Sequence, residues 1–163
     1  MVVSNTSPLR YLIVVGQAGL IGKVFQQVLI PPAVIAELTH PSAPPEVRLW
    51  MAQPPAWLVM QTLQRQPAPE LLRTLDRGEA EALQLDLETR ADFVLMDERL
   101  GRRAGLSLGL TLIGALGLLR ESYRQQLVLD PLQVLDQMKR IGFRISPALA
   151  RQFQQEIQSM RSQ

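Results

Sequence analysis

The sequence predicts an α/β protein with a parallel central sheet that is covered by helices on both faces. Two observations point to this class. Apolar runs of strand length alternate along the chain with runs of helical period, and continuously apolar strands are typical of parallel sheets buried on both faces. The chain has 163 residues and is 47% hydrophobic, which suits one domain with a substantial core rather than two.

The expected strands are short apolar runs bounded by polar or turn-forming residues. They cover residues 2–4, 28–30, 57–60, 93–96 and 111–113. The expected helices begin at capping residues or prolines and end at glycines or prolines. They cover residues 8–15, 18–25, 33–38, 46–53, 70–75, 76–90, 98–106, 115–123, 131–140 and 147–160.

Composition narrows the kinds of protein that this chain can be. It has no cysteine, which excludes disulfides and thiolate metal sites. Its longest nearly apolar run, residues 106–119, is shorter than the roughly 20 residues that a membrane-spanning helix needs. The N-terminus has no basic segment ahead of an apolar stretch, so no signal peptide is visible. We therefore expect a soluble, cytoplasmic protein with no membrane partner.

Charge is distributed unevenly along the chain. Residues 1–98 carry 7 basic and 11 acidic side chains, whereas residues 99–163 carry 10 basic and 4 acidic ones. Such an asymmetry suggests a polyanionic partner near the basic part. The alternative is a set of solvated helix faces with no binding role.

Polar residues follow the expected strands at the edge where ligands bind in open parallel sheets. Asn5 and Asp97 each come directly after a strand, and Glu37 and Glu79 lie on helices that could lean over the same edge. Carboxylates gathered there would repel one another unless a cation neutralised them. Oxygen ligands of this kind suit hard divalent ions such as Mg²⁺ and Mn²⁺. The pattern therefore favours a divalent metal site.

Each of these residues also has a structural explanation. Asp97 could cap the helix that follows it, and Glu79 stands three residues after Asp76, as in a capping box. Glu37 could be an exposed helix residue. Asn5 could simply start a turn, because its side chain can bond nearby backbone groups.

The order of the motifs resembles the PIN-domain family of metal-dependent ribonucleases, which includes the VapC-type toxins. The stretches that carry the resemblance are VVSNTSPL, VLIPPAVIAEL, LDRGEAEALQLDLE, ADFVLMDERLGRRAG and GLTLIGALGLL. VSNTSPL, GEAEA and DERLGRRA look closest to one prokaryotic branch of the family. The C-terminal stretch IGFRISPAL also resembles the helical tail of that branch. The resemblance implies a PIN-like domain over residues 1–125 and a helical extension over residues 126–163, packed on the same domain.

By this resemblance the four acidic positions of the family fall on Asn5, Glu37, Glu79 and Asp97, with Glu81 as a substitute for Glu79. The family usually has aspartate where this chain has Asn5, so one carboxylate is missing. An asparagine oxygen can still bind a metal or a metal-bound water. Three carboxylates remain, which is enough for one Mg²⁺ or Mn²⁺ ion.

The implied activity is metal-dependent hydrolysis of RNA phosphodiesters by a VapC-like toxin, which Asn5 could attenuate. Arginines just past the metal-side strand end would hold the RNA backbone through charge-assisted bonds, and hydroxyls after the first strand would assist. These substrate-binding residues are Arg99, Arg102, Arg103, Thr6 and Ser7. The resemblance also implies an antitoxin partner and a homodimer or higher oligomer.

Two other functions compete with this hypothesis. A degenerate PIN module could bind RNA or a protein partner without cleavage, and Asn5 is the chief support for it. A receiver-like domain could use Asp97 as a phosphate acceptor, but it would need a lysine near a late strand end. The only lysines are Lys23 and Lys139, and neither is well placed.

Overall fold

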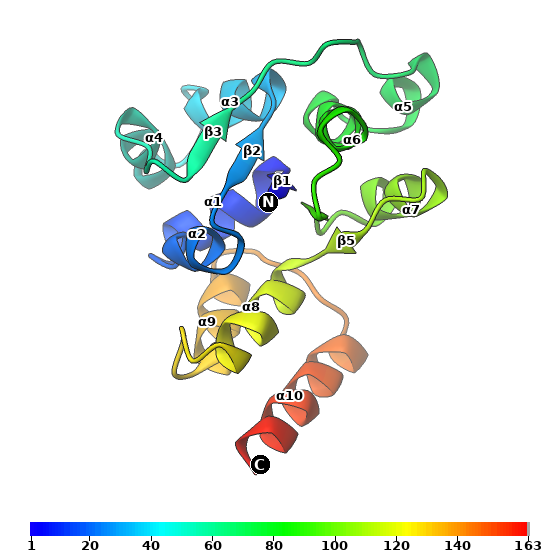
Figure 1. Ribbon diagram of the computed structural model, residues 1–163. Helices are drawn as coiled ribbons and strands as arrows, with labels where there is room; N and C mark the ends of the chain where they lie inside the picture. The colour runs from blue at the N-terminus through cyan, green and yellow to red at the C-terminus, as the bar shows by residue number, and fades with distance from the viewer. Residues whose placement is uncertain (163) are drawn as a thin grey trace.

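The computed structural model describes residues 1–162 and confirms the predicted α/β class. Within that range, its centre is a five-stranded parallel sheet in the order β3-β2-β1-β4-β5 (Figure 1). The strands are β1 (Val2–Ser4), β2 (Val28–Ile30), β3 (Leu58–Met60), β4 (Phe93–Leu95) and β5 (Leu112–Ile113). All five fall where the apolar runs predict strands.

The helices also lie close to their predicted positions. They are α1 (Thr6–Val14), α2 (Gly19–Phe25), α3 (Pro32–Thr39), α4 (Pro45–Ala52), α5 (Pro69–Thr74), α6 (Arg77–Thr89), α7 (Arg99–Ser107), α8 (Ala115–Arg124), α9 (Pro131–Arg140) and α10 (Pro147–Arg161). The largest difference at a helix start is in α1, which begins two residues before the predicted Pro8. Proline is tolerated there because the first turn of a helix does not use its backbone N–H groups.

The two faces of the sheet bury different groups of helices. Side chains alternate along each strand, so Val2 of β1 packs with α1, α2 and α8, whereas Val3 packs with α6. The alternation has a period of two residues, as expected for extended backbone. On the α6 face the buried cluster contains Leu83 and Leu85. The continuous apolar runs in the sequence thus reflect burial on both faces.

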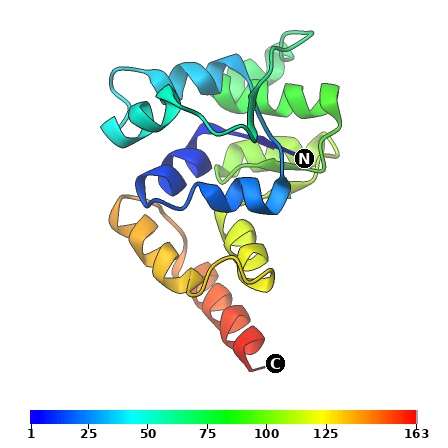
Figure 2. The ribbon, with the colours of Figure 1, turned by 60° about the vertical axis from the view of Figure 1, so that its left-hand side comes forward.

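The C-terminal helices α9 and α10 pack beside α8 at one end of the molecule (Figure 2). Met138, Phe153 and Ile157 are buried in the same core cluster as Leu118 and Leu119 of α8. The predicted boundary at residue 125 falls in the turn after α8, and the hydrophobic core continues across it. No helix within residues 1–162 has the length and apolar character that crossing a bilayer requires.

Strand order determines where the candidate site lies. The chain runs from the central strand β1 to β2 and β3 on one side, then returns to β4 and β5 on the other. The backbone N–H of Asn5 donates to the Leu95 carbonyl at 3.0 Å, which joins the ends of β1 and β4. This is the topological switch point, where open α/β sheets bind ligands.

Candidate functional site

Asn5 lies at the carboxyl end of β1 and is only 2% exposed. Its Nδ2 donates to Oε2 of Glu98 at 3.1 Å. Among residues 1–162, its Oδ1 has no hydrogen-bond partner although the atom is buried. Asn5 is the N-cap residue of α1, yet its side chain makes no capping bond. The side chain is therefore directed to the neighbouring strand end, and the turn-starting explanation does not account for it.

Asp97 lies at the same edge, just after β4. Its Oδ1 accepts from the backbone N–H of Ala115 at 2.9 Å, and a Cβ on Gly114 would lie 2.7 Å from that oxygen. Its Oδ2 is buried with no hydrogen-bond partner among the described residues. Desolvation raises the pKa of Asp97 to about 6, opposed by the Ala115 N–H. Asp97 therefore caps the start of α8 rather than α7, whose N-cap is Glu98.

Glu79 is held at the start of α6 by the predicted capping box. The Glu79 N–H donates to Oδ1 of Asp76 at 2.8 Å, and the Asp76 N–H donates to Oε2 of Glu79 at 3.0 Å. Desolvation, together with the negative charges of Asp76, Glu98 and Glu37, raises the pKa of Glu79 to about 7. The capping box uses one carboxylate oxygen of Glu79, so capping and ligand binding are compatible.

Glu37 reaches the same region from α3. It accepts a hydrogen bond from the Thr6 hydroxyl and another from the Gly78 backbone N–H. A Cβ on Gly78 would lie 2.6 Å from Oε1 of Glu37, so glycine at this position makes room for the carboxylate. Partial desolvation raises the pKa of Glu37, and the charges of Asp76 and Glu98 add to the effect.

Glu81, the substitute for Glu79, has a structural role. Its Oε2 accepts from the Ala33 N–H at 2.8 Å and its Oε1 accepts from Arg77 Nε at 2.8 Å. Glu81 is 3% exposed. One oxygen therefore fastens α6 to the start of α3 and the other accepts from Arg77 within α6. With both oxygens in use, Glu79 is favoured as the site residue.

Sequence reasoning missed Glu98. It accepts from Asn5, and its charge raises the pKa of Glu37, Glu79 and Asp97. Glu98 is thus the one carboxylate whose field reaches all three predicted acids. Its position directly after Asp97, at a strand end, is the signal that could have identified it.

The oxygen atoms at this edge of the sheet meet only part of the coordination that a divalent cation needs. No group of three metal-ligating side chains lies close enough to bind one ion within residues 1–162. Two buried oxygens on adjacent strand ends, Asn5 Oδ1 and Asp97 Oδ2, lack a partner there. Mg²⁺ is commonly bound through one or two carboxylates while it keeps several waters. The residues therefore fit a hydrated Mg²⁺-like ion and not a fully enclosed one.

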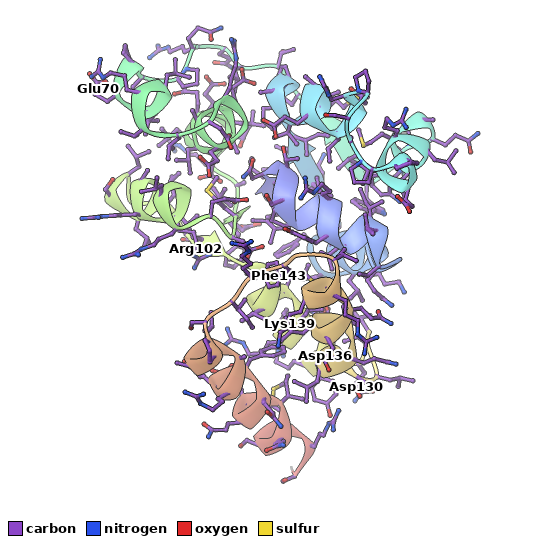
Figure 3. All side chains as sticks on the ribbon, turned by 180° about the vertical axis from the view of Figure 1, so that it is seen from behind. Glu70, Arg102, Asp130, Asp136, Lys139 and Phe143 are labelled. Carbon is purple, nitrogen blue, oxygen red and sulfur yellow. The ribbon has the colours of Figure 1, made fainter. Side chains whose placement is uncertain are left out.

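Of the predicted RNA-binding residues, Arg99 and Arg102 line a cavity of about 670 Å³ that also includes Asp97. Arg102 Nη1 donates to the Met96 carbonyl at 2.8 Å, which holds the guanidinium at this strand end (Figure 3). Arg103 is exposed and does not line the cavity. Figure 3 shows Arg102 close to the chain segment that carries Phe143.

The predicted hydroxyl residues occupy two other positions. The Thr6 hydroxyl donates to Glu37, and so it orients a carboxylate. Ser7 lines a second hollow that also includes Asp97 and Glu98. Both residues therefore lie beside the acidic side chains, as their place after β1 predicts.

Comparison with known families decides the assignment. The PIN-domain family profile matches residues 1–159. The chain belongs to the PIN-domain family. PIN domains are nuclease folds that generally depend on divalent metals, and the five-stranded parallel sheet is consistent with this fold. Comparisons with curated proteins and with solved structures found no match.

Proposed function

We propose that this PIN domain is a metal-dependent ribonuclease that hydrolyses RNA phosphodiesters, and that it is the toxin of a VapC-like toxin-antitoxin pair. The observation that carries the proposal is the pair of unpartnered buried oxygens, Asn5 Oδ1 and Asp97 Oδ2, at the switch point. Three glutamates surround this edge of the sheet, Glu37, Glu79 and Glu98, and the charge of Glu98 raises the pKa of the other two.

The acidic side chains would hold Mg²⁺ or Mn²⁺ through Asp97 and Glu98, with Glu37 and Glu79 beside them. Such an ion activates water and neutralises charge on phosphoryl oxygens. The Ala115 N–H keeps Asp97 in place. Glu79 has one carboxylate oxygen outside the capping box, so it could accept a proton from the attacking water.

Glu98 can compensate for the negative charge that is missing because position 5 is asparagine rather than aspartate. Asn5 donates to Glu98 at 3.1 Å, which an aspartate at position 5 could not do when ionised. The charge absent from the end of β1 is therefore supplied from the start of α7. This pairing favours an active nuclease over the degenerate module, because the negative charge of the site is retained.

A VapC-like role implies two kinds of protein contact, one with an antitoxin and one with further copies of this chain. We propose that the protein binds an antitoxin protein and self-associates into a homodimer or higher oligomer. We also propose that it acts on RNA in the cytoplasm. Exposed apolar side chains support a protein contact on α7, where Leu100 is 60% and Leu106 is 63% exposed.

The decisive experiment is cleavage of a mixed RNA pool by the full chain with Mn²⁺, Mg²⁺ or EDTA. We expect cleavage only with metal, and a loss of about 100-fold in Asp97→Asn, since ligand loss at metal sites costs this much or more. Asp136→Asn is the matched control, because Asp136 is exposed on α9. Cleavage that survives EDTA would contradict the proposal. An inert wild type beside an active Asn5→Asp variant would point to the binding module.

A further inference from the structure

We infer that the connector between α9 and α10 forms a wall of the RNA-binding groove, and that Arg144 on this connector binds the RNA backbone. The inference rests on the proposed function, because it takes RNA as the occupant. It concerns residues 141–146, which lie far along the chain from the acidic residues.

The connector is anchored to the PIN core. Phe143 is 6% exposed and belongs to the main hydrophobic cluster. Its ring meets Tyr11 of α1 edge-on with centroids 5.3 Å apart, and the Tyr11 hydroxyl donates to the Gly142 carbonyl at 3.3 Å. Gly142 has φ +106°, a conformation that favours glycine. The backbone that carries Arg144 is therefore held at a defined place beside α1.

Arg144 lies between two hollows, and Asp97 lines both. One is the cavity of about 670 Å³ bounded by β5, α8 and α10. The other, about 480 Å³, is also lined by Ser7 and Glu98. A strand that leaves the acidic residues in either direction would therefore pass the Arg144 side chain.

The charges in the larger cavity favour a polyanion. Its lining includes four arginines and two carboxylates: Arg99, Arg102, Arg120, Arg144, Asp97 and Glu156. Arg120 bonds Glu156 at 3.3 Å. In contrast, Arg99 and Arg144 are exposed, and neither forms a salt bridge with any residue from 1 to 162. Unpaired guanidinium groups in a groove are typical phosphate ligands.

The size and lining of the cavity indicate that the RNA bound there is single-stranded. A cavity of about 670 Å³ admits individual nucleotides, whereas a double helix would have to lie across its mouth. Its lining also includes the apolar side chains of Leu112, Leu116 and Leu149. Phe143 and Phe153 are too buried to stack on bases, so backbone contacts rather than stacking would provide affinity.

The test is fluorescence anisotropy of a labelled, unstructured RNA oligonucleotide with the full chain in EDTA, where metal-dependent cleavage is prevented. We expect Arg144→Gln to weaken binding about fourfold at 0.15 M salt. We also expect the slope of log affinity against log salt to fall by about 0.7, the value of one single-strand phosphate contact. Arg151→Gln is the control, since Arg151 is exposed on α10 and lines neither hollow. Equal affinities for both variants would overturn the inference, as would a wild type that binds an acidic peptide but no RNA.

A parallel cleavage assay separates this inference from the proposed function. RNA binding that depends on Arg144 without any metal-dependent cleavage would support the groove and reject the nuclease. Metal-dependent cleavage with an unchanged KM in Arg144→Gln would support the nuclease and reject the groove. A raised KM with nearly unchanged kcat supports both.

Discussion

The acidic edge of the sheet and the arginine groove beside it meet at Asp97, yet they are built in opposite ways. The acidic side chains are held by hydrogen bonds from the protein itself: Asp97 from the Ala115 N–H, Glu37 from Thr6 and Glu79 from the Asp76 N–H. The groove arginine Arg144, in contrast, is exposed. The difference agrees with the two proposals, a cation at the acidic edge and an RNA backbone in the groove.

Assembling like charges lowers the stability of the folded chain. Desolvation and mutual repulsion raise the pKa of Glu79 to about 7 and that of Asp97 to about 6, so the ionised forms are disfavoured there. Exposed arginines impose little such cost, because water solvates them. Changes in the acidic edge should therefore alter stability and activity together, whereas changes in the groove should mainly alter binding.

Among variants that leave every acidic side chain in place, the largest effect is expected from Gly114→Ala. The new Cβ would lie 2.7 Å from Oδ1 of Asp97 and 3.4 Å from Nη1 of Arg102, which displaces the carboxylate from the Ala115 N–H. We expect metal-dependent cleavage to fall about 10- to 100-fold, with a loss of about 1–3 kcal/mol in the free energy of unfolding. Gly19→Ala is the control, because nothing lies within 4 Å of its Cβ position. Wild-type cleavage rates in Gly114→Ala would show that Asp97 tolerates displacement.

Asn5→Asp tests whether Glu98 replaces the missing charge. The substitution exchanges a hydrogen bond of 3.1 Å for a repulsion between carboxylates. We expect a loss of about 1–3 kcal/mol in the free energy of unfolding in EDTA and its recovery with Mn²⁺, both measured by urea denaturation. The double variant Asn5→Asp with Glu98→Gln completes the cycle and should restore most of the loss. Equal destabilisation of the single and double variants in EDTA would mean that the two side chains are not coupled.

Asp86 provides a buried carboxylate outside the site for comparison. It is 4% exposed, its Oδ1 has no partner among residues 1–162, and desolvation raises its pKa from 3.8 to about 6. The folded state binds this proton more tightly than the unfolded chain does, so the free energy of unfolding decreases as the pH rises from about 4 to 6. We expect Asp86→Asn to remove this decrease and to stabilise the protein by about 1–2 kcal/mol above pH 6.

The measurement for Asp86 is urea denaturation from pH 4 to 8, with and without Mn²⁺. Because Asp86 lies near the opposite end of α6 from Glu79, Mn²⁺ should leave its contribution unchanged. Parallel pH profiles for the wild type and Asp86→Asn would refute the assignment of the slope to this residue.

The smallest effect is expected from Glu156→Gln in the groove. This change releases Arg120 from its 3.3 Å salt bridge and removes a negative charge from the cavity lining. RNA binding in EDTA should strengthen about two- to fourfold, while the free energy of unfolding changes by less than about 1 kcal/mol because the pair is exposed. Glu121→Gln, outside that cavity, is the control. Weaker binding by Glu156→Gln would argue against RNA in the groove.

Local signals in the sequence predicted the elements well. The five apolar runs correspond to the five strands in residues 1–162, since two-sided burial requires continuous apolar residues. The capping box at Asp76 and Glu79 is present because its partners are three residues apart. Placing Asn5 and Asp97 at one edge follows from parallel strands alone, and their role as ligands with Glu37 and Glu79 stays a prediction.

The parts of the site that the sequence could not predict depend on contacts between distant residues. Asp97 bonds Ala115 rather than the helix that it precedes, and Asn5 bonds Glu98, 93 positions away. Arg144 reaches the neighbourhood of Asp97 only because Phe143 is buried against α1. Local propensity carries no information on such pairings.

The sequence by itself determined the α/β class, the strand positions and the polar residues at the strand ends, because these depend on short-range periodicity and turn chemistry. The tertiary structure alone decided the strand order, the hydrogen bond between Asn5 and Glu98 and the position of the C-terminal connector beside Asp97. These features arise from the packing of segments far apart in the chain, where burial and hydrogen bonding select one arrangement among many that the local pattern allows.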